Sequence, residues 1–193
     1  MSLRARTSNE ARFYMMVTPC PACGKGPWVF ESAQQAGEKA LGVEAHCRAC
    51  LQAEVFSFEI EHDTPLTGSE SETINPTEQP SGLIDLAQWL SLFYLLLERA
   101  ATEPDRLVSR QASYQAALCL GEALKFYRDD EQPDETAFFS DASREVFREH
   151  PKDFSRRRLQ DMRGKLPAMN VMSRRIDRDH WVRNRKWWQF WRR

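Results

Sequence analysis

Two C-x-x-C pairs constrain the fold of this chain more than any other feature of its sequence. Cys20 and Cys23 form the first pair, and 23 residues separate it from the second, Cys47 and Cys50. Each two-residue gap places two thiols on one side of an ion, and a small sheet brings the two turns together. Four thiolates in a tetrahedral array are typical ligands of a structural zinc ion. The sequence therefore predicts one Zn²⁺ held by these four cysteines, with no coordination position open to water.

The first turn, Cys20-Pro-Ala-Cys23-Gly24, resembles the first knuckle of zinc ribbons and rubredoxin-like modules, and Cys47-Arg-Ala-Cys50 resembles the second. The resemblance covers residues 13–61, about a quarter of the chain. It implies a small antiparallel β module around a zinc ion, and it implies little about function, because one fold serves many functions. The second turn departs from the pattern, since Leu51 stands where the first turn has Gly24, a residue that adopts positive φ at little cost.

Other interpretations of the cysteines stay open. A redox dithiol would place one exposed C-x-x-C at a helix N-terminus, whereas these pairs lie between expected strands. Iron of the rubredoxin type takes the same four thiolates, because the ligand set alone does not choose the metal. His46, directly before Cys47, is a further candidate ligand. The fifth cysteine, Cys119, lies in an expected helix and is interpreted as a small buried apolar residue.

The cysteines are expected to stay reduced. The residues before Phe13 are polar and contain no apolar segment of the kind that directs secretion. We therefore expect a cytoplasmic protein, in which paired C-x-x-C thiols favour metal binding over disulfides. The longest mostly apolar run, Leu83–Leu97, contains Asp85. It is shorter than a bilayer span, which needs about 20 residues, and we expect a buried core helix there.

Composition and periodicity predict an α+β fold, a small antiparallel β zinc ribbon followed by an all-α bundle of about four helices. The ribbon is expected to begin with a strand at Phe13–Val17 and to end with one at Val55–Ile60, whose aromatic face points inward. The linker holds three prolines and few apolar residues, so we expect it to bury too little surface to become ordered. The predicted segments are a disordered N-terminus (1–12), the zinc ribbon (13–61), the linker (62–81), the α-helical domain (82–167) and a basic Trp/Arg-rich tail (168–193).

Four helices are expected in the α-helical domain. The first is apolar almost all the way round, which is typical of a central helix covered on several sides. Pro104 and Pro151 fit the first turns of the second and fourth helices, and Ser140 or Asp141 caps the third. The predicted ranges are 82–101, 103–128, 140–149 and 151–165.

Charge is divided unevenly along the chain. Residues 156–193 carry 13 Lys or Arg and 3 Asp or Glu, a net charge of +10, whereas the other 155 residues carry 14 basic and 25 acidic side chains, a net charge of −11. Four of the six tryptophans lie between arginines in the last fourteen residues. The candidate contact residues of this tail are Trp181, Arg183, Arg185, Lys186, Trp187, Trp188, Phe190, Trp191, Arg192 and Arg193.

Four surfaces suit such a tail. At an anionic membrane the indoles lie at headgroup level and each basic residue contributes about 1 kcal/mol. On nucleic acid the aromatic rings stack on bases and the arginines contact phosphates, with Lys25, Lys39 and Arg48 added from the ribbon. The tail also suits a protein partner, or the acidic body of its own chain.

No motif for catalysis appears in the sequence. It contains no nucleophile elbow, P-loop, dinucleotide fingerprint or His-Glu-x-x-His motif. We therefore predict a non-enzymatic, zinc-binding adaptor or interaction protein that contacts a protein partner or the inner membrane surface. Nucleic-acid binding through the ribbon and the tail is the alternative, and an enzyme seated in the helical domain is the third hypothesis.

Overall fold

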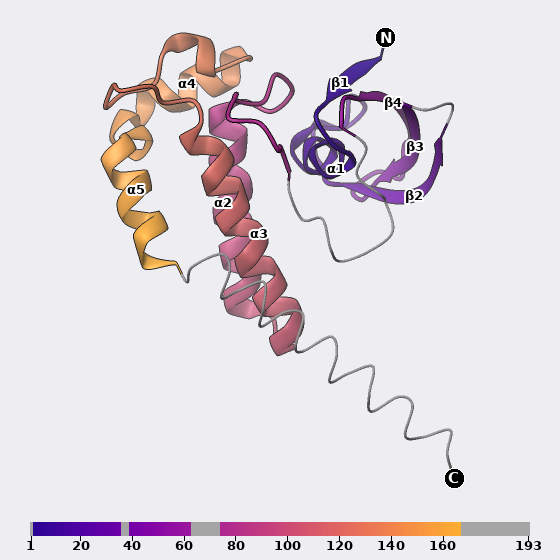
Figure 1. Ribbon diagram of the computed structural model, residues 1–193. Coiled ribbons are helices and arrows are strands. Elements are labelled where there is room, and N and C mark those ends of the chain that lie inside the picture. The colour runs from indigo at the N-terminus through magenta and orange to yellow at the C-terminus, as the bar shows by residue number, and fades with distance from the viewer. Residues whose placement is uncertain (1, 36–38, 63–73, 167–193) are drawn as a thin grey trace.

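The computed structural model describes residues 2–35, 39–62 and 74–166 (Figure 1). The tail and residues 63–73 of the predicted linker lie outside these ranges. Within them the chain joins a four-stranded sheet to helices that lie mostly in its C-terminal part. The predicted α+β class is therefore confirmed.

The sheet has the strand order β1-β4-β3-β2. β2, β3 and β4 pair antiparallel, and β1 pairs parallel to β4. In β4 the side chains of Phe56, Phe58 and Ile60 are buried between exposed neighbours, which confirms the predicted alternation, because successive side chains of a strand point to opposite faces. The strands are β1 (Leu3–Ala5), β2 (Trp28–Gln35), β3 (Ala40–Cys47) and β4 (Ala53–Ile60).

The first 17 residues fold differently from the prediction. Residues 1–12 were expected to be disordered and Phe13–Val17 to form a strand, but β1 and α1 (Ser8–Val17) occupy this part of the chain. The prediction is wrong here because the apolar pattern of α1 starts before Phe13, with the buried Ala11. Thr7 caps the helix, since its side chain accepts a hydrogen bond from the Glu10 N–H at 3.2 Å.

Helix α1 lies inside the curve of the sheet (Figure 1) and contributes to two hydrophobic cores. Ala11 and Met15 are buried in the core beneath the sheet. Phe13 is buried in the helical core, where its ring lies 5.9 Å from the ring of Trp89. The helix therefore joins the cysteine-bearing sheet to the helical body.

The four predicted helices of the C-terminal part are present, with shifted ends. Pro151 opens a short 3₁₀ turn rather than the last α-helix, which Ser155 caps instead by accepting from the Arg158 N–H. The first of the four carries the largest buried set, with Trp89, Leu92 and Phe93 almost fully covered. The helices are α2 (Leu86–Thr102), α3 (Arg106–Leu124), α4 (Asp141–Glu149) and α5 (Arg156–Lys165).

The end of the predicted linker packs against the body. Ile74 is 1% exposed and lies in the helical core. Its carbonyl accepts a hydrogen bond from the Thr7 hydroxyl at 2.6 Å. The expectation that residues 62–81 bury too little surface to become ordered is therefore wrong for residues 74–81.

Two buried carboxyl groups lie where α1, residues 74–81 and α3 meet. Glu10 is 1% exposed and Glu122 is 6% exposed. The Arg6 N–H donates to Glu10, and the Lys125 ammonium lies 2.8 Å from Glu122. Burial raises the pKa of both carboxyls more than these cationic neighbours lower it. Each carboxyl also keeps one oxygen without a hydrogen-bond partner among the described residues.

The substitution Glu10→Gln should stabilise the fold increasingly as pH rises. The pKa of Glu10 is raised above its ordinary value of 4.5 in the folded chain. The folded protein therefore loses stability as the pH rises from this ordinary value through the folded pKa, because the buried carboxyl must then lose its proton. Glutamine stays neutral and still accepts from the Arg6 N–H. Urea unfolding near pH 4.5 and at neutral pH checks this, with the exposed Glu98→Gln as control. A gain that is equal at both pH values would contradict the raised pKa.

Candidate metal centre

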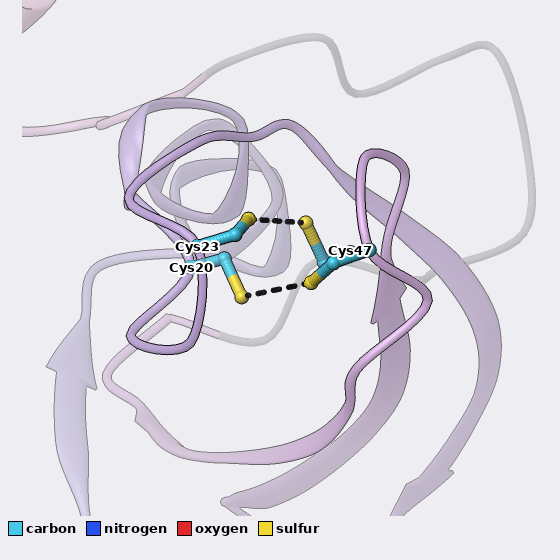
Figure 2. Close-up of side chains that lie close together, drawn as sticks. Cys20, Cys23 and Cys47 are labelled. Atoms are coloured by element: carbon cyan, nitrogen blue, oxygen red, sulfur yellow. Dashed lines mark hydrogen bonds between the residues drawn. The ribbon is translucent and has the colours of Figure 1, made fainter.

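The four thiols of Cys20, Cys23, Cys47 and Cys50 converge at one end of the sheet (Figure 2). The sulfur atoms of Cys20 and Cys50 lie 3.7 Å apart, as do those of Cys23 and Cys47. All four lie within 4.8 Å of one another. Sulfur atoms about 2.3 Å from a central zinc ion would be about 3.8 Å apart in a tetrahedron, whereas a disulfide bond is about 2 Å long. Two of the sulfur–sulfur distances therefore match those around a tetrahedral metal ion, and all four sulfur atoms lie close enough together to bind one ion.

The first turn follows α1 and leads into β2. The Gly24 N–H donates to the Cys20 carbonyl at 2.8 Å, and the Cys20 N–H donates to the Lys25 carbonyl at 2.6 Å. Gly24 has a φ of +68°, a conformation that glycine adopts without steric cost. These bonds fold the chain back so that the thiols of Cys20 and Cys23 face the second turn.

The second turn, between β3 and β4, repeats this geometry despite its different sequence. The Leu51 N–H donates to the Cys47 carbonyl, and the Cys47 N–H donates to the Gln52 carbonyl, both at 2.8 Å. Leu51 has a φ of +62° and so adopts the left-handed conformation that Gly24 adopts in the first turn. The Arg48 N–H donates to the Pro27 carbonyl at 3.0 Å and ties the two turns together. Leu51 thus keeps the geometry of the turn although it departs from the ribbon pattern, and its backbone is strained as a result.

The substitution Leu51→Gly should stabilise the protein by about 0.5–1 kcal/mol. A left-handed conformation costs a residue with a Cβ about 1–2 kcal/mol, and the extra chain entropy of glycine offsets part of the gain. Little burial is lost, because the side chain of Leu51 is 73% exposed. The midpoint of thermal unfolding checks this. Leu51→Ala is the matched control, and an equal gain in both variants would contradict strain as the cause.

The thiols differ in burial and in pKa. Cys20 and Cys47 are buried, Cys23 is half-buried and Cys50 is exposed. Although burial opposes the thiolate of Cys47, hydrogen bonds from the backbone of Cys50 and Ala49 lower its pKa to about 7. The Gln52 N–H favours the thiolate of Cys50, but the neighbouring thiol of Cys23 and burial raise its pKa to about 12. A nearby cation such as a metal ion would therefore be needed to bring the thiol of Cys50 into its thiolate form.

Comparison with family models, with curated proteins and with solved structures finds no match for this chain. What the four cysteines do is therefore inferred from their own geometry and chemistry. Among the described residues, no helix has the length and the hydropathy that a membrane span requires.

The other candidates from the sequence lie apart from the cysteine cluster. His46 points to the opposite face of the sheet, where its Nδ1 lies 2.6 Å from a carboxylate oxygen of Glu31, so it is not grouped with the four cysteines. Cys119 is fully buried in α3, where burial raises its pKa. Lys25, Lys39 and Arg48 are exposed, and the candidate tail residues 181–193 lie outside the described residues.

Proposed function

We propose that this protein is a zinc-dependent adaptor that attaches to an anionic membrane surface through its Trp/Arg-rich tail and presents its body to a protein partner. The observation that supports the zinc ion in this proposal is the cluster of four thiols within 4.8 Å of one another. Zn²⁺ favours four thiolates in this geometry and has no redox chemistry of its own. The ion would be structural, because protein ligands fill all four positions.

A structural ion would tie together two turns that lie far apart in the sequence. The first turn joins α1 to β2, and the second joins β3 to β4. The ion would thus clamp the helix that carries Phe13 to the central strands of the sheet. Its role would be to fix the shape of the sheet and its attachment to the helical body, which favours an interaction protein over a catalyst.

The buried carboxyl groups do not favour an enzyme. Raised pKa values are frequent at active sites, but Glu10 and Glu122 are enclosed between α1, residues 74–81 and α3. Neither lines the groove that the described residues form beside α3. Their position supports a role in packing the helical body against the sheet rather than in contact with a substrate.

Charge favours a membrane over nucleic acid as the surface that the tail contacts. The outer face of the sheet exposes Glu31, Glu44 and Glu59, of which Glu31 pairs with His46 and Glu59 with Arg4. The acidic face of the ribbon would repel a nucleic acid. The counterion release that favours nucleic-acid binding would then come from the tail alone. An anionic membrane would attract the tail and repel the acidic body. The body would then lie away from the lipid, where a protein partner could bind it.

Co-sedimentation of the full chain with vesicles tests the proposal. We expect binding to phosphatidylserine vesicles and none to phosphatidylcholine vesicles, because each basic residue near an anionic surface contributes about 1 kcal/mol. The variant Arg183→Gln, Arg185→Gln should lose most of the binding. The matched control, Arg156→Gln, Arg157→Gln in α5, should retain it. Tight binding of duplex DNA without vesicle binding would overturn the membrane role in favour of the nucleic-acid alternative.

A further inference from the structure

A groove of about 700 Å³ lies between the C-terminal end of α3, residues 78–81 and the connection from α3 to α4. The sequence of this connection is mostly polar between residues 129 and 136. In the structure it forms one wall of the groove. Aromatic side chains from two segments line the inside, and carboxylates line the edge.

The aromatic part of the groove contains Phe126 and Phe139, whose ring centres lie 6.4 Å apart. Phe139 is 44% exposed. Its backbone is held in place, because its N–H donates to the buried carboxylate of Asp85 at 3.0 Å. The preceding Phe138 points the other way and stacks on Phe147 in the core. Phe139 is therefore an apolar side chain that the fold holds at the surface.

The edge of the groove is acidic. Glu78, Asp130 and Asp134 line it, and residues 129–135 contain five acidic and no basic side chains. Glu78 and Asp130 form no ion pair with another described residue. The lining also holds two cations: Lys125, already bound at 2.8 Å to Glu122 and to the Thr77 carbonyl, and the exposed Arg128, which lies close enough to attract the carboxylate of Asp134. A ligand with aromatic rings and several positive charges would complement such a surface.

We propose that this groove binds the Trp/Arg-rich segment 181–193 of the same chain. That segment contains five aromatic and five basic residues and no acidic one. Its indoles suit the exposed ring of Phe139, because aromatic pairs attract beyond the area that they bury. Its arginines suit the unpaired carboxylates at the edge.

The position of α5 makes this contact reachable. At the start of α5 the Arg156 N–H donates to the carbonyl of Glu131, next to the acidic edge, at 2.9 Å. The ten residues of α5 span about 15 Å, so the helix ends about that far from this hydrogen bond. Residues 167–180 extend to about 50 Å at most, which is long enough for segment 181–193 to return to the groove.

Docking in the groove goes beyond the proposed function and does not depend on it. Where the membrane role also holds, the groove and the membrane compete for the same tryptophans and arginines. The body would then sequester the tail until an anionic surface displaces it. This consequence rests on the proposed function, whereas the docking itself does not.

Carbodiimide coupling of the full-length protein tests the docking. The reagent joins a lysine amine to a carboxylate in direct contact, and Lys186 is the only lysine after residue 165. In the monomer fraction, mass spectrometry should find Lys186 joined mainly to Glu78, Asp130 or Asp134. Coupling of Lys186 chiefly to carboxylates outside the groove, such as Glu44 or Glu145, would overturn the proposal.

Two variants, one in the groove and one in the tail, ensure that the test does not rest on a single substitution. Phe139→Ala should lower the yield of these links about ten-fold, the change expected for the loss of one well-packed aromatic contact. Trp187→Ala, Trp188→Ala, which leaves the body unchanged, should lower it similarly. The exposed Phe30→Ala on the sheet is the control and should not change it. Unchanged links in both test variants would refute the docking.

Vesicle binding separates the two proposals. If the groove sequesters the tail, Phe139→Ala should bind phosphatidylserine vesicles several-fold more tightly than the wild type. Groove links without any vesicle binding would refute the membrane role and leave the docking in place. Vesicle binding without groove links would refute the docking and leave the membrane role in place.

Discussion

Replacing Cys47 by serine should remove the bound metal ion and unfold the sheet. Cys47 is fully buried at the end of β3, and its sulfur lies 3.7 Å from that of Cys23. A structural zinc ion contributes about 10–16 kcal/mol to the folding of a small domain, which is comparable to the whole net stability of about 5–15 kcal/mol of most proteins. A serine at this position leaves three thiolates and a poor fourth ligand, so most of that contribution is lost.

Elemental analysis and circular dichroism check this result. The wild type should carry one zinc per chain, and Cys47→Ser should carry far less and lose β-sheet signal. Cys119→Ala is the matched control, because Cys119 is buried in α3 outside the cluster; it should keep both the zinc and the sheet. A wild-type protein that folds fully after exhaustive chelation would show that the metal is not structural.

Features set by local spacing could be predicted from the sequence. The two C-x-x-C pairs define four ligands before any fold is known, because each turn positions its own two sulfur atoms. The alternation of Phe56, Phe58 and Ile60 defines the inner face of β4 in the same way, since the period of a strand is two residues. In both cases the decisive neighbours lie within a few residues of one another.

Features that depend on distant segments could not be predicted. β1 is three residues long and exists because Leu3 pairs with Phe58 in β4, a contact that no local pattern indicates. Helix α1 is short, and its amphipathic pattern is weak because it buries residues in two cores rather than one. The groove escaped prediction for the same reason, since Asp85 fixes Phe139 from 54 residues away.

A second large effect on stability is expected from substitutions in α1, because this helix lies between two cores. Phe13→Ala should destabilise the helical body by about 3–5 kcal/mol, the usual cost of removing a buried phenylalanine ring. Phe13 is 2% exposed and packs against Trp89 of α2. Its neighbour Met15 is 3% exposed and belongs to the core beneath the sheet. The same change at Met15 should therefore destabilise the sheet and its cysteine cluster instead.

Two signals followed during urea unfolding distinguish these effects. Ellipticity at the helical band reports on the helical body, and the charge-transfer absorption of cobalt substituted at the four cysteines reports on the sheet. Phe13→Ala should shift the first signal to lower urea more than the second, and Met15→Ala should do the reverse. Leu95→Ala, which removes an exposed side chain, should shift neither. If both core variants moved the two signals together, α1 would not lie between separable cores, and the sheet and helices would unfold as a single cooperative unit.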